Sequence, residues 1–157
     1  MKEKIELNSE AITLRKEFGE DANSLIDIFS LIHNNDDLTI VFYPMSSRVS
    51  GVCIRDGKNK IIGVNSTSTY GRQRFTIAHE LYHLFFHEDF KRVICSTDFE
   101  SNKDPQEKEA DMFASYFLAP YEALSYVIKN KLKKEKQQLE LEDVIKIEQY
   151  FGMSRQA

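Results

Sequence analysis

Apolar residues recur along this chain with two different periods, and the period changes near residue 70. Before that point, runs at residues 38–43, 51–55 and 60–65 are rich in β-branched and aromatic side chains, as strands usually are. Residues 56–59, Asp-Gly-Lys-Asn, separate the second run from the third and are typical of a hairpin turn. The pattern therefore predicts a small sheet, which we expect to be antiparallel.

The pattern that follows has the 3.6-residue period of α-helices. Residues 72–88 carry two adjacent apolar stripes, so this helix should be largely buried. A second helix should begin after Asp104, a favourable N-cap residue, with Pro105 at its first position. Further segments with helical spacing are residues 23–33, 121–134 and 139–151, the last ended by Gly152. These elements predict an α+β fold, in which the sheet packs on the buried helix.

The composition is that of an ordinary globular protein. We expect a single domain over residues 1–157, because this length suffices for one hydrophobic core and leaves little room for two. No run of about 18 apolar residues occurs, and the first ten residues lack the apolar segment of a secretion signal. The expected location is therefore the cytoplasm, with no membrane partner. A net charge of −4 also argues against a broad nucleic-acid-binding surface.

The buried helix carries the sequence His79-Glu80-Leu81-Tyr82-His83, an HExxH motif. A spacing of four places both imidazoles on one helix face, where their nitrogens can converge on one ion. Glu80 is rotated by about 100° and can take a proton from water without being a ligand. Alternatively, backbone carbonyls could satisfy both histidines, but two imidazoles and a carboxylate are costly to bury without partners. The motif therefore predicts a zinc site, with His79 and His83 as ligands and Glu80 as general base.

A catalytic zinc ion takes three protein ligands and keeps one position for water. His87 continues the row of histidines, but it is about 12 Å along the helix from His79, too far to share one metal. We expect it at the helix end or beside a ligand. The metzincin motif is excluded because it needs Gly and His at positions 86 and 89, where this chain has Phe86 and Asp89. The third ligand should therefore be a carboxylate from another element.

The second helix offers three carboxylates, those of Glu107, Glu109 and Asp111. Glu107 and Asp111 stand four apart, so Glu107 could bind the metal while Asp111 accepts a ring N–H from a ligand histidine. Glu107 also follows Asp104 by three residues, the position from which a capping-box Glu bonds back to the N-cap. The residues alone leave ligation and capping equally open for Glu107, with Glu109 as the reserve ligand.

Two segments of the chain resemble the ImmA/IrrE family of metallopeptidases. Residues 74–83, RFTIAHELYH, resemble the RFTxAHELGH segment of that family. Residues 107–120, EKEADMFASYFLAP, are similar to its ExxA[ND]xFAxxLLxP segment. The resemblance is best over residues 38–120 and weaker over the helical segment 121–157, where the family pattern implies that this chain is cut short.

The resemblance implies that Glu107 is the third metal ligand, which decides between ligation and capping. Asn65 and His87 also fit the usual outline of the family, whereas Tyr82 stands where Gly is common. This departure should change the floor of the cleft without removing a ligand.

The implied activity is peptide hydrolysis at zinc, with Glu80 passing a proton from water to the leaving amine. The resemblance also implies a protein substrate, a helix-turn-helix repressor of a mobile element, a prophage or a stress response. The alternative is a non-catalytic regulator that titrates a repressor or antitoxin by binding. Direct DNA binding by residues 145–157 is less favoured, because Arg155 is their only basic residue after Lys146. Candidate groups for stabilising the oxyanion are Tyr70, Arg72, His87 and Tyr116.

Overall fold

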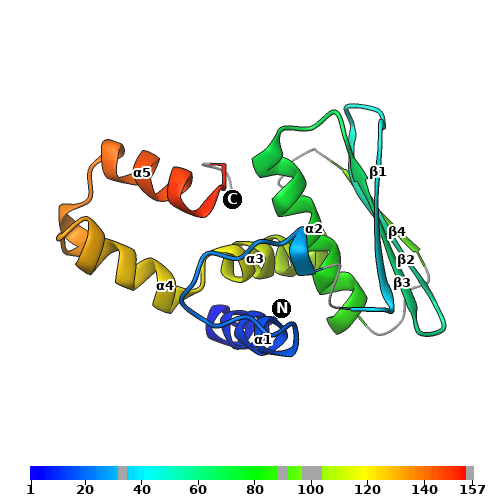
Figure 1. Cartoon of the computed structure of the whole chain (residues 1–157), viewed down its shortest axis with the longest axis horizontal. Helices are drawn as coiled ribbons and strands as arrows, with labels where there is room; N and C mark the ends of the chain where they lie inside the picture. The colour runs from blue at the N-terminus through cyan, green and yellow to red at the C-terminus, as the bar shows by residue number, and fades with distance from the viewer. Residues whose placement is uncertain (32–34, 88–91, 97–103, 155–157) are drawn as a thin grey trace.

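The computed structural model describes residues 1–31, 35–87, 92–96 and 104–154. Within these ranges the α+β fold is confirmed, with the helices gathered on one side of a sheet (Figure 1). The helices are α1 (Lys4–Glu17), α2 (Tyr70–Phe86), α3 (Pro105–Leu118), α4 (Tyr121–Tyr126), η2 (Val127–Lys131), η3 (Lys136–Gln138) and α5 (Leu141–Phe151). The strands are β1 (Leu38–Tyr43), β2 (Val49–Asp56), β3 (Asn59–Asn65) and β4 (Arg92–Ser96). None of the helices in the described ranges is long and apolar enough to span a bilayer.

The sheet is mixed, with strand order β1-β3-β2-β4. The predicted hairpin is present: Asp56 pairs with Asn59, and Gly57 in the turn has a φ of 58°, which suits glycine. Strand β4 pairs antiparallel with β2, but β1 runs parallel to β3, with Leu38 opposite Lys60. The prediction of an antiparallel sheet was therefore wrong for β1. An apolar run indicates a strand but does not reveal the direction of its neighbour.

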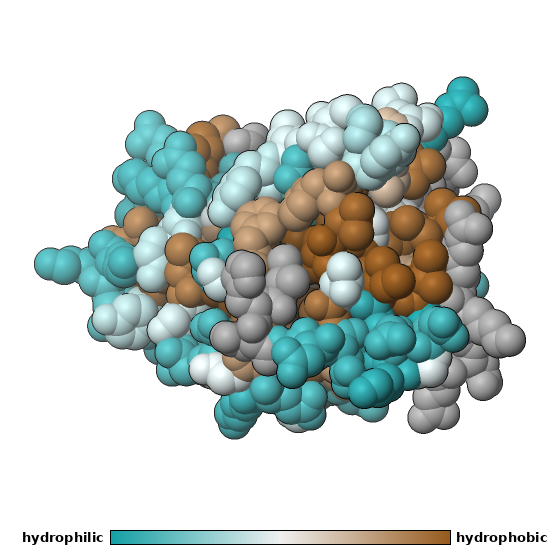
Figure 2. Space-filling model, turned by 45° about the vertical axis from the view of Figure 1, so that its right-hand side comes forward, coloured by the Kyte–Doolittle hydropathy of each residue, from teal (hydrophilic) through white to brown (hydrophobic). Residues whose placement is uncertain are grey.

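The face of the sheet that is turned away from α2 carries apolar side chains. Val41, Gly63, Val52 and Ile94 form one row across the four strands. Val41 is 47% exposed and Ile94 57% exposed. Figure 2, in which the sheet side of the molecule comes forward, shows a hydrophobic area bordered by polar residues. One face of the sheet is thus in the core, and the other is in contact with solvent.

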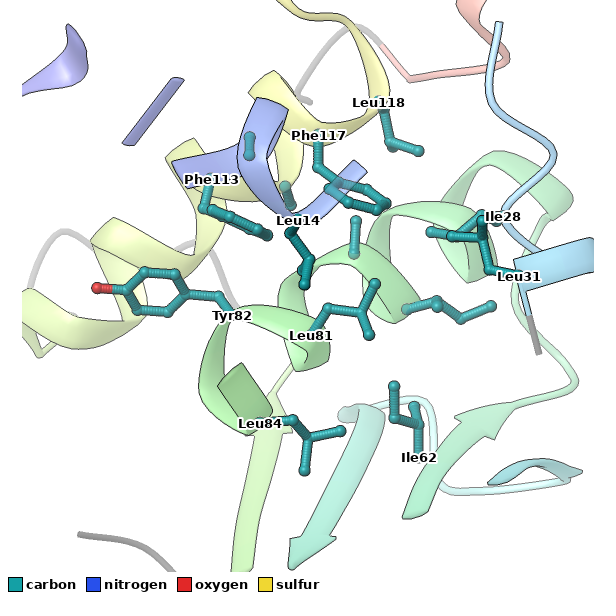
Figure 3. Close-up of a cluster of buried hydrophobic side chains, with 14 of the residues drawn as sticks. Leu14, Ile28, Leu31, Ile62, Leu81, Tyr82, Leu84, Phe113, Phe117 and Leu118 are labelled. Carbon is teal, nitrogen blue, oxygen red and sulfur yellow. The ribbon is translucent and has the colours of Figure 1, made fainter. Parts of the chain in front are cut away.

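Helix α2 lies between the sheet and the other helices (Figure 1). Its N-cap residue, Thr69, accepts a hydrogen bond from the backbone N–H of Arg72. All residues from 74 to 84 are buried, as the two apolar stripes predicted. Figure 3 shows core side chains of α2 and of the elements around it, among them Leu81 of α2, Leu14 of α1, Phe117 of α3 and Ile62 of β3. The motif residues of α2 therefore lie in the interior of the protein.

The prediction of a helix at residues 23–33 was wrong over residues 23–31, and its last two residues lie outside the described ranges. Helix α1 was missed. Residues 21–31 form turns that end in a short 3₁₀ segment. Their apolar spacing has another cause: Ile26, Ile28 and Leu31 are buried side chains of an irregular segment. Asp27 stabilises a turn there by accepting hydrogen bonds from the Ser30 hydroxyl and the Phe29 N–H, at 2.6 and 3.2 Å.

Two buried arginines hold this irregular segment against the helices. Arg15 of α1 donates to the backbone carbonyls of Asp21, Ser24 and Phe117, at 2.7, 2.5 and 2.6 Å. Arg74 of α2 donates to the carbonyls of Ile26 and Phe151, at 3.0 and 3.3 Å. Buried carbonyls need such partners, and each arginine supplies several donors. The segment is therefore connected to α1, α2, α3 and α5 through charged donors.

The C-terminal helices agree in part with the prediction. Residues 121–134, expected to be one helix, form α4 followed by the π-helical η2. Helix α5 is confirmed, and Gly152 ends it in the left-handed conformation at φ 61° and ψ 40°. Asp104 is the predicted N-cap of α3 and accepts from the backbone N–H of Gln106 at 3.1 Å.

Candidate metal centre

His79 and His83 project from α2 towards α3, and both are buried, with exposed fractions of 4% and 1%. Their Nε2 atoms are 3.2 Å apart. The Glu107 carboxylate of α3 is 3.3 Å from Nε2 of His79 and 3.2 Å from Nε2 of His83. The three side chains each offer one ligand atom, and these atoms all lie within 4.8 Å of one another.

The spacing of these atoms suits a small divalent cation. Ligand bonds of about 2.0 to 2.1 Å in tetrahedral geometry place neighbouring ligand atoms about 3.3 Å apart. The contacts among the two imidazoles and the carboxylate are 3.2 to 3.3 Å long. The donor set of two histidine nitrogens and one carboxylate oxygen is one that zinc accepts. The ligand roles of His79, His83 and Glu107 stay predictions, but their geometry fits a metal.

The second nitrogen of each histidine also has a partner. Nδ1 of His79 is 2.9 Å from Oδ1 of Asp111, the contact expected from the spacing of Glu107 and Asp111. Nδ1 of His83 is 3.2 Å from Nδ1 of His87, which follows the end of α2 and lies beside a candidate ligand, as predicted. An Nδ1–H that donates to such a partner leaves the lone pair of Nε2 facing Glu107. Asp111 and His87 therefore orient the two candidate ligands.

The electrostatics of the cluster favour positive charge. Burial lowers the pKa of His79, but hydrogen bonds to Asp111 and Glu107 and the charge of Glu80 outweigh it and raise the pKa to about 9. Burial raises the pKa of Glu107, but its bonds to His79 and His83 outweigh burial and lower it. A divalent cation can take the place of these protons, because metal binding to imidazole releases them.

Glu80 is fully buried, with an exposed fraction of 0%. It faces β2, and its charge acts on the neighbouring His79. Its position beside the histidine pair is compatible with the predicted general base, a role that remains a prediction.

The structure distinguishes the carboxylates of α3. Asp104 caps the helix at Gln106, while the Glu107 carboxylate lies against the histidines, so its position favours ligation over capping. Glu109 lies on another side of the helix, because two residues rotate a side chain by about 200°. It accepts from the Tyr82 hydroxyl and from the backbone N–H of Lys2, both at 2.6 Å. These contacts therefore argue against Glu109 as the reserve ligand.

Tyr82, which stands where the family commonly has glycine, is buried between α2 and α3. Its ring packs against Phe113 and Phe86, with centroid distances of 5.4 and 5.8 Å. Burial and the hydrogen bond to Glu109 both raise the pKa of its hydroxyl. The ring removes none of the candidate ligands from the site, as the sequence indicated.

The four candidates for oxyanion stabilisation lie in different places. Tyr70 is mostly exposed and packs its ring against Phe29, whereas Tyr116 lines a groove of about 370 Å³ beside α1. Burial lowers the pKa of Arg72, and the charge of Asp111 opposes this shift. Arg72 and His87 are thus the two candidates with a link to the cluster among the described residues.

Replacing Glu107 with glutamine should weaken metal binding at least 10- to 100-fold, the loss seen even when partners of ligands are removed. The amide keeps the size of the side chain but removes the charge beside His79 and His83. Glu109→Gln is the matched control, because this carboxylate faces Tyr82 and should leave metal affinity nearly unchanged. Competition with a chromophoric chelator measures both affinities. The opposite ranking would remove Glu107 from the ligand set.

Comparison with known proteins agrees with this geometry. Residues 36–157 match the family model described as the IrrE N-terminal-like domain. Over 57 residues, the chain is 40% identical to the radiation response metalloprotease IrrE of Deinococcus deserti. That alignment covers 36% of this chain and 19% of the relative.

A solved structure, a Mycobacterium tuberculosis transcriptional regulator, has a similar fold, with a TM-score of 0.60 and 17% identity. The match covers 95% of this chain and 43% of the regulator, so this chain spans less than half of either relative. The family match includes the C-terminal helices, beyond the region in which the sequence motifs were strongest. The resemblance to ImmA/IrrE proteins is therefore confirmed, and the chain belongs to the peptidase family described as the IrrE N-terminal-like domain.

Proposed function

We propose that this chain is a zinc-dependent endopeptidase in which His79, His83 and Glu107 hold the ion. The observation that carries the proposal is the convergence of these three side chains at contacts of 3.2 to 3.3 Å beside the buried Glu80. The family of the chain implies a metal ion, and the donor set favours zinc.

A bound zinc ion would lower the pKa of water and polarise the carbonyl of the scissile peptide bond. Glu80 would accept the proton of the attacking water and later donate it to the leaving amine. Asp111 would hold His79 in one tautomer through the 2.9 Å contact to Nδ1, and His87 would do the same for His83. Each polar contact described above for His79 and His83 therefore has a role, either in holding the ion or in orienting a ligand.

An extended substrate would pair with an edge of the sheet. The sheet has two edges, β1 and β4, and β4 pairs with the strand that meets Glu80. In this pairing Gly51 of β2 lies opposite Cys95 of β4. An edge strand offers unpaired backbone groups to an incoming peptide. We infer that the substrate adds as a further strand along β4, which would bring its peptide bonds towards the histidine pair.

We infer that the substrate is a helix-turn-helix repressor that controls a mobile element, a prophage or a stress response. This inference is supported by the family and by the relative described as a radiation response metalloprotease. An enzyme with such a substrate would work in the cytoplasm as an antirepressor, without contacting DNA itself.

The test is incubation of the zinc-loaded protein with a helix-turn-helix repressor encoded beside its gene, followed by intact-mass measurement. We expect two new fragments, whose masses sum to that of the repressor plus one water. A chelator should prevent their appearance, and added zinc should restore it. Release of the repressor from DNA without any fragment would instead identify a non-catalytic regulator that titrates its partner.

A further inference from the structure

Gly51 lies where strand β2 meets the side chain of Glu80. A β-carbon at this position would be 2.5 Å from Cγ2 of Thr76 and 3.0 Å from Oε1 of Glu80. It would also be 2.9 Å from the backbone carbonyl oxygen of Gly63. Carbon atoms do not approach other atoms this closely without a shift of one of them, and glycine in a strand permits a close approach. Only glycine therefore allows α2 and β2 to pack as they do.

Strand β2 is also irregular at this residue. Val49 pairs with Ser96 and Gly51 pairs with Cys95, so Ser50 is an extra residue opposite β4. Ser50 and Gly51 are consequently both buried, whereas a regular strand turns successive residues to opposite faces. A bulge of this kind bends a strand locally, and bulges are frequent beside active sites. The bend and the missing side chain occur together at the point of contact with Glu80.

Gly63 in the neighbouring strand β3 provides a comparison. A β-carbon there would be 2.8 Å from Cγ1 of Val52 and 3.3 Å from Cε of Met45. Both contacts are with side chains of the sheet and of the segment between β1 and β2, and neither involves α2. The same substitution at the two glycines would therefore disturb the sheet in both cases but reach Glu80 only from position 51.

We propose that Gly51 is a positioning residue for catalysis, because its lack of a side chain lets the Glu80 carboxylate lie against β2 beside the histidine pair. The inference rests on the proposed function. Thr76 and Glu80 are four residues apart on one helix face, so a side chain at position 51 would press on both. The third contact is with the Gly63 carbonyl oxygen, which belongs to the sheet backbone and can therefore move less than the side chains of Thr76 and Glu80. The Glu80 carboxylate would therefore be displaced.

The first experiment compares Gly51→Ala with Gly63→Ala in the zinc-loaded full chain. Displacement of a reacting group by about 1 Å can cost 10²-fold, so we expect Gly51→Ala to lower kcat by about 10- to 100-fold. The KM and the zinc affinity should stay nearly unchanged, because none of the three atoms closest to the added β-carbon belongs to His79, His83 or Glu107. Gly63→Ala should lower the melting temperature but keep kcat. An unchanged kcat in folded Gly51→Ala would overturn the proposal.

If Gly51→Ala does not fold, the comparison is made in a Thr76→Ser background. That change removes Cγ2, the atom closest to the added β-carbon, and leaves the contact with Glu80 in place. The double variant should then fold and still show the lower kcat. Normal kcat in this folded variant would equally count against a role for Gly51.

A double-mutant cycle with Glu80→Asp tests the contact directly. Aspartate is shorter by one methylene, so it should relieve the clash that Gly51→Ala creates. The loss in kcat of the double variant should therefore be smaller than the product of the losses in the two single variants. Likewise, in the zinc-free protein, its loss in melting temperature should be smaller than the sum of their two losses. If the wild type hydrolyses the repressor but neither measurement shows coupling, the role of Gly51 is overturned and the proposed function stands. If the melting temperatures show coupling but the wild type does not hydrolyse the repressor, the proposed function is overturned. The contact between Gly51 and Glu80 would then have no catalytic role.

Discussion

Glu80→Gln should lower the rate of peptide hydrolysis by roughly 10² to 10⁴, the usual contribution of a general base. Glutamine keeps the size of the side chain and fits the same space between α2 and β2. Its amide cannot accept the proton of the attacking water, however, and the buried position admits no bulk solvent as a substitute. Metal binding should survive, because the three predicted ligands are unchanged. The variant should therefore retain about one zinc ion per chain.

Intact-mass measurement of the repressor after incubation gives the rate, and elemental analysis gives the zinc content. The matched control is Glu109→Gln, which makes the same change at a buried glutamate on the side of Tyr82. It should cleave normally if it folds. A rate within a few-fold of wild type for zinc-loaded Glu80→Gln would exclude Glu80 as the general base.

His83→Ala should lose its zinc and, with it, all measurable hydrolysis. His83 is almost fully buried, and its Nε2 lies 3.2 Å from both other candidate ligands, so its removal takes away one of the three converging ligand atoms. Removal of a direct ligand should cost more than the 10- to 100-fold in affinity that loss of an orienting partner costs. His87→Ala provides that milder case, because His87 contacts Nδ1 of His83, the nitrogen that faces away from Glu107.

The two variants are compared by elemental analysis after purification without a metal-binding tag and by chelator competition. Zinc should be near wild-type content in His87→Ala and absent in His83→Ala. Full zinc occupancy in His83→Ala would contradict the assignment of the centre. An affinity loss in His87→Ala as large as that in His83→Ala would move His87 into the ligand set.

Much of the candidate centre could be predicted from the sequence because its geometry is local to two helices. The spacing of His79 and His83 places them on one face, and the spacing of Glu107 and Asp111 does the same for α3. The family resemblance, which includes both the HExxH segment and the segment that begins at Glu107, then favoured metal ligation over helix capping as the role of Glu107. The separation of Glu109 from the face of Glu107 also follows from helix geometry, because two residues rotate a side chain by about 200°.

Other parts could not be predicted because they depend on contacts between distant segments. Helix α1 buries only a narrow stripe that includes Leu7, Ala11 and Leu14, so its amphipathic pattern is weak. The apolar spacing of residues 23–33 is typical of a helix, but Arg15 and Arg74 bind the backbone carbonyls of Ser24 and Ile26 in this segment. The contact of Gly51 with Glu80 had one local signal, a glycine at the start of a predicted strand, and glycine in a strand often marks a close approach.

The parallel pairing of β1 with β3 determines when β1 can find its partner during synthesis. The β2–β3 hairpin closes over a two-residue turn and can form in about 1–10 μs once it has left the ribosome. Strand β1 emerges earlier, yet its partner β3 follows only after β2 has been made. Its apolar residues therefore stay unpaired while the chain grows, at roughly 5–20 residues per second. During this interval we expect the backbone groups of β1 to be open to pairing with another nascent chain.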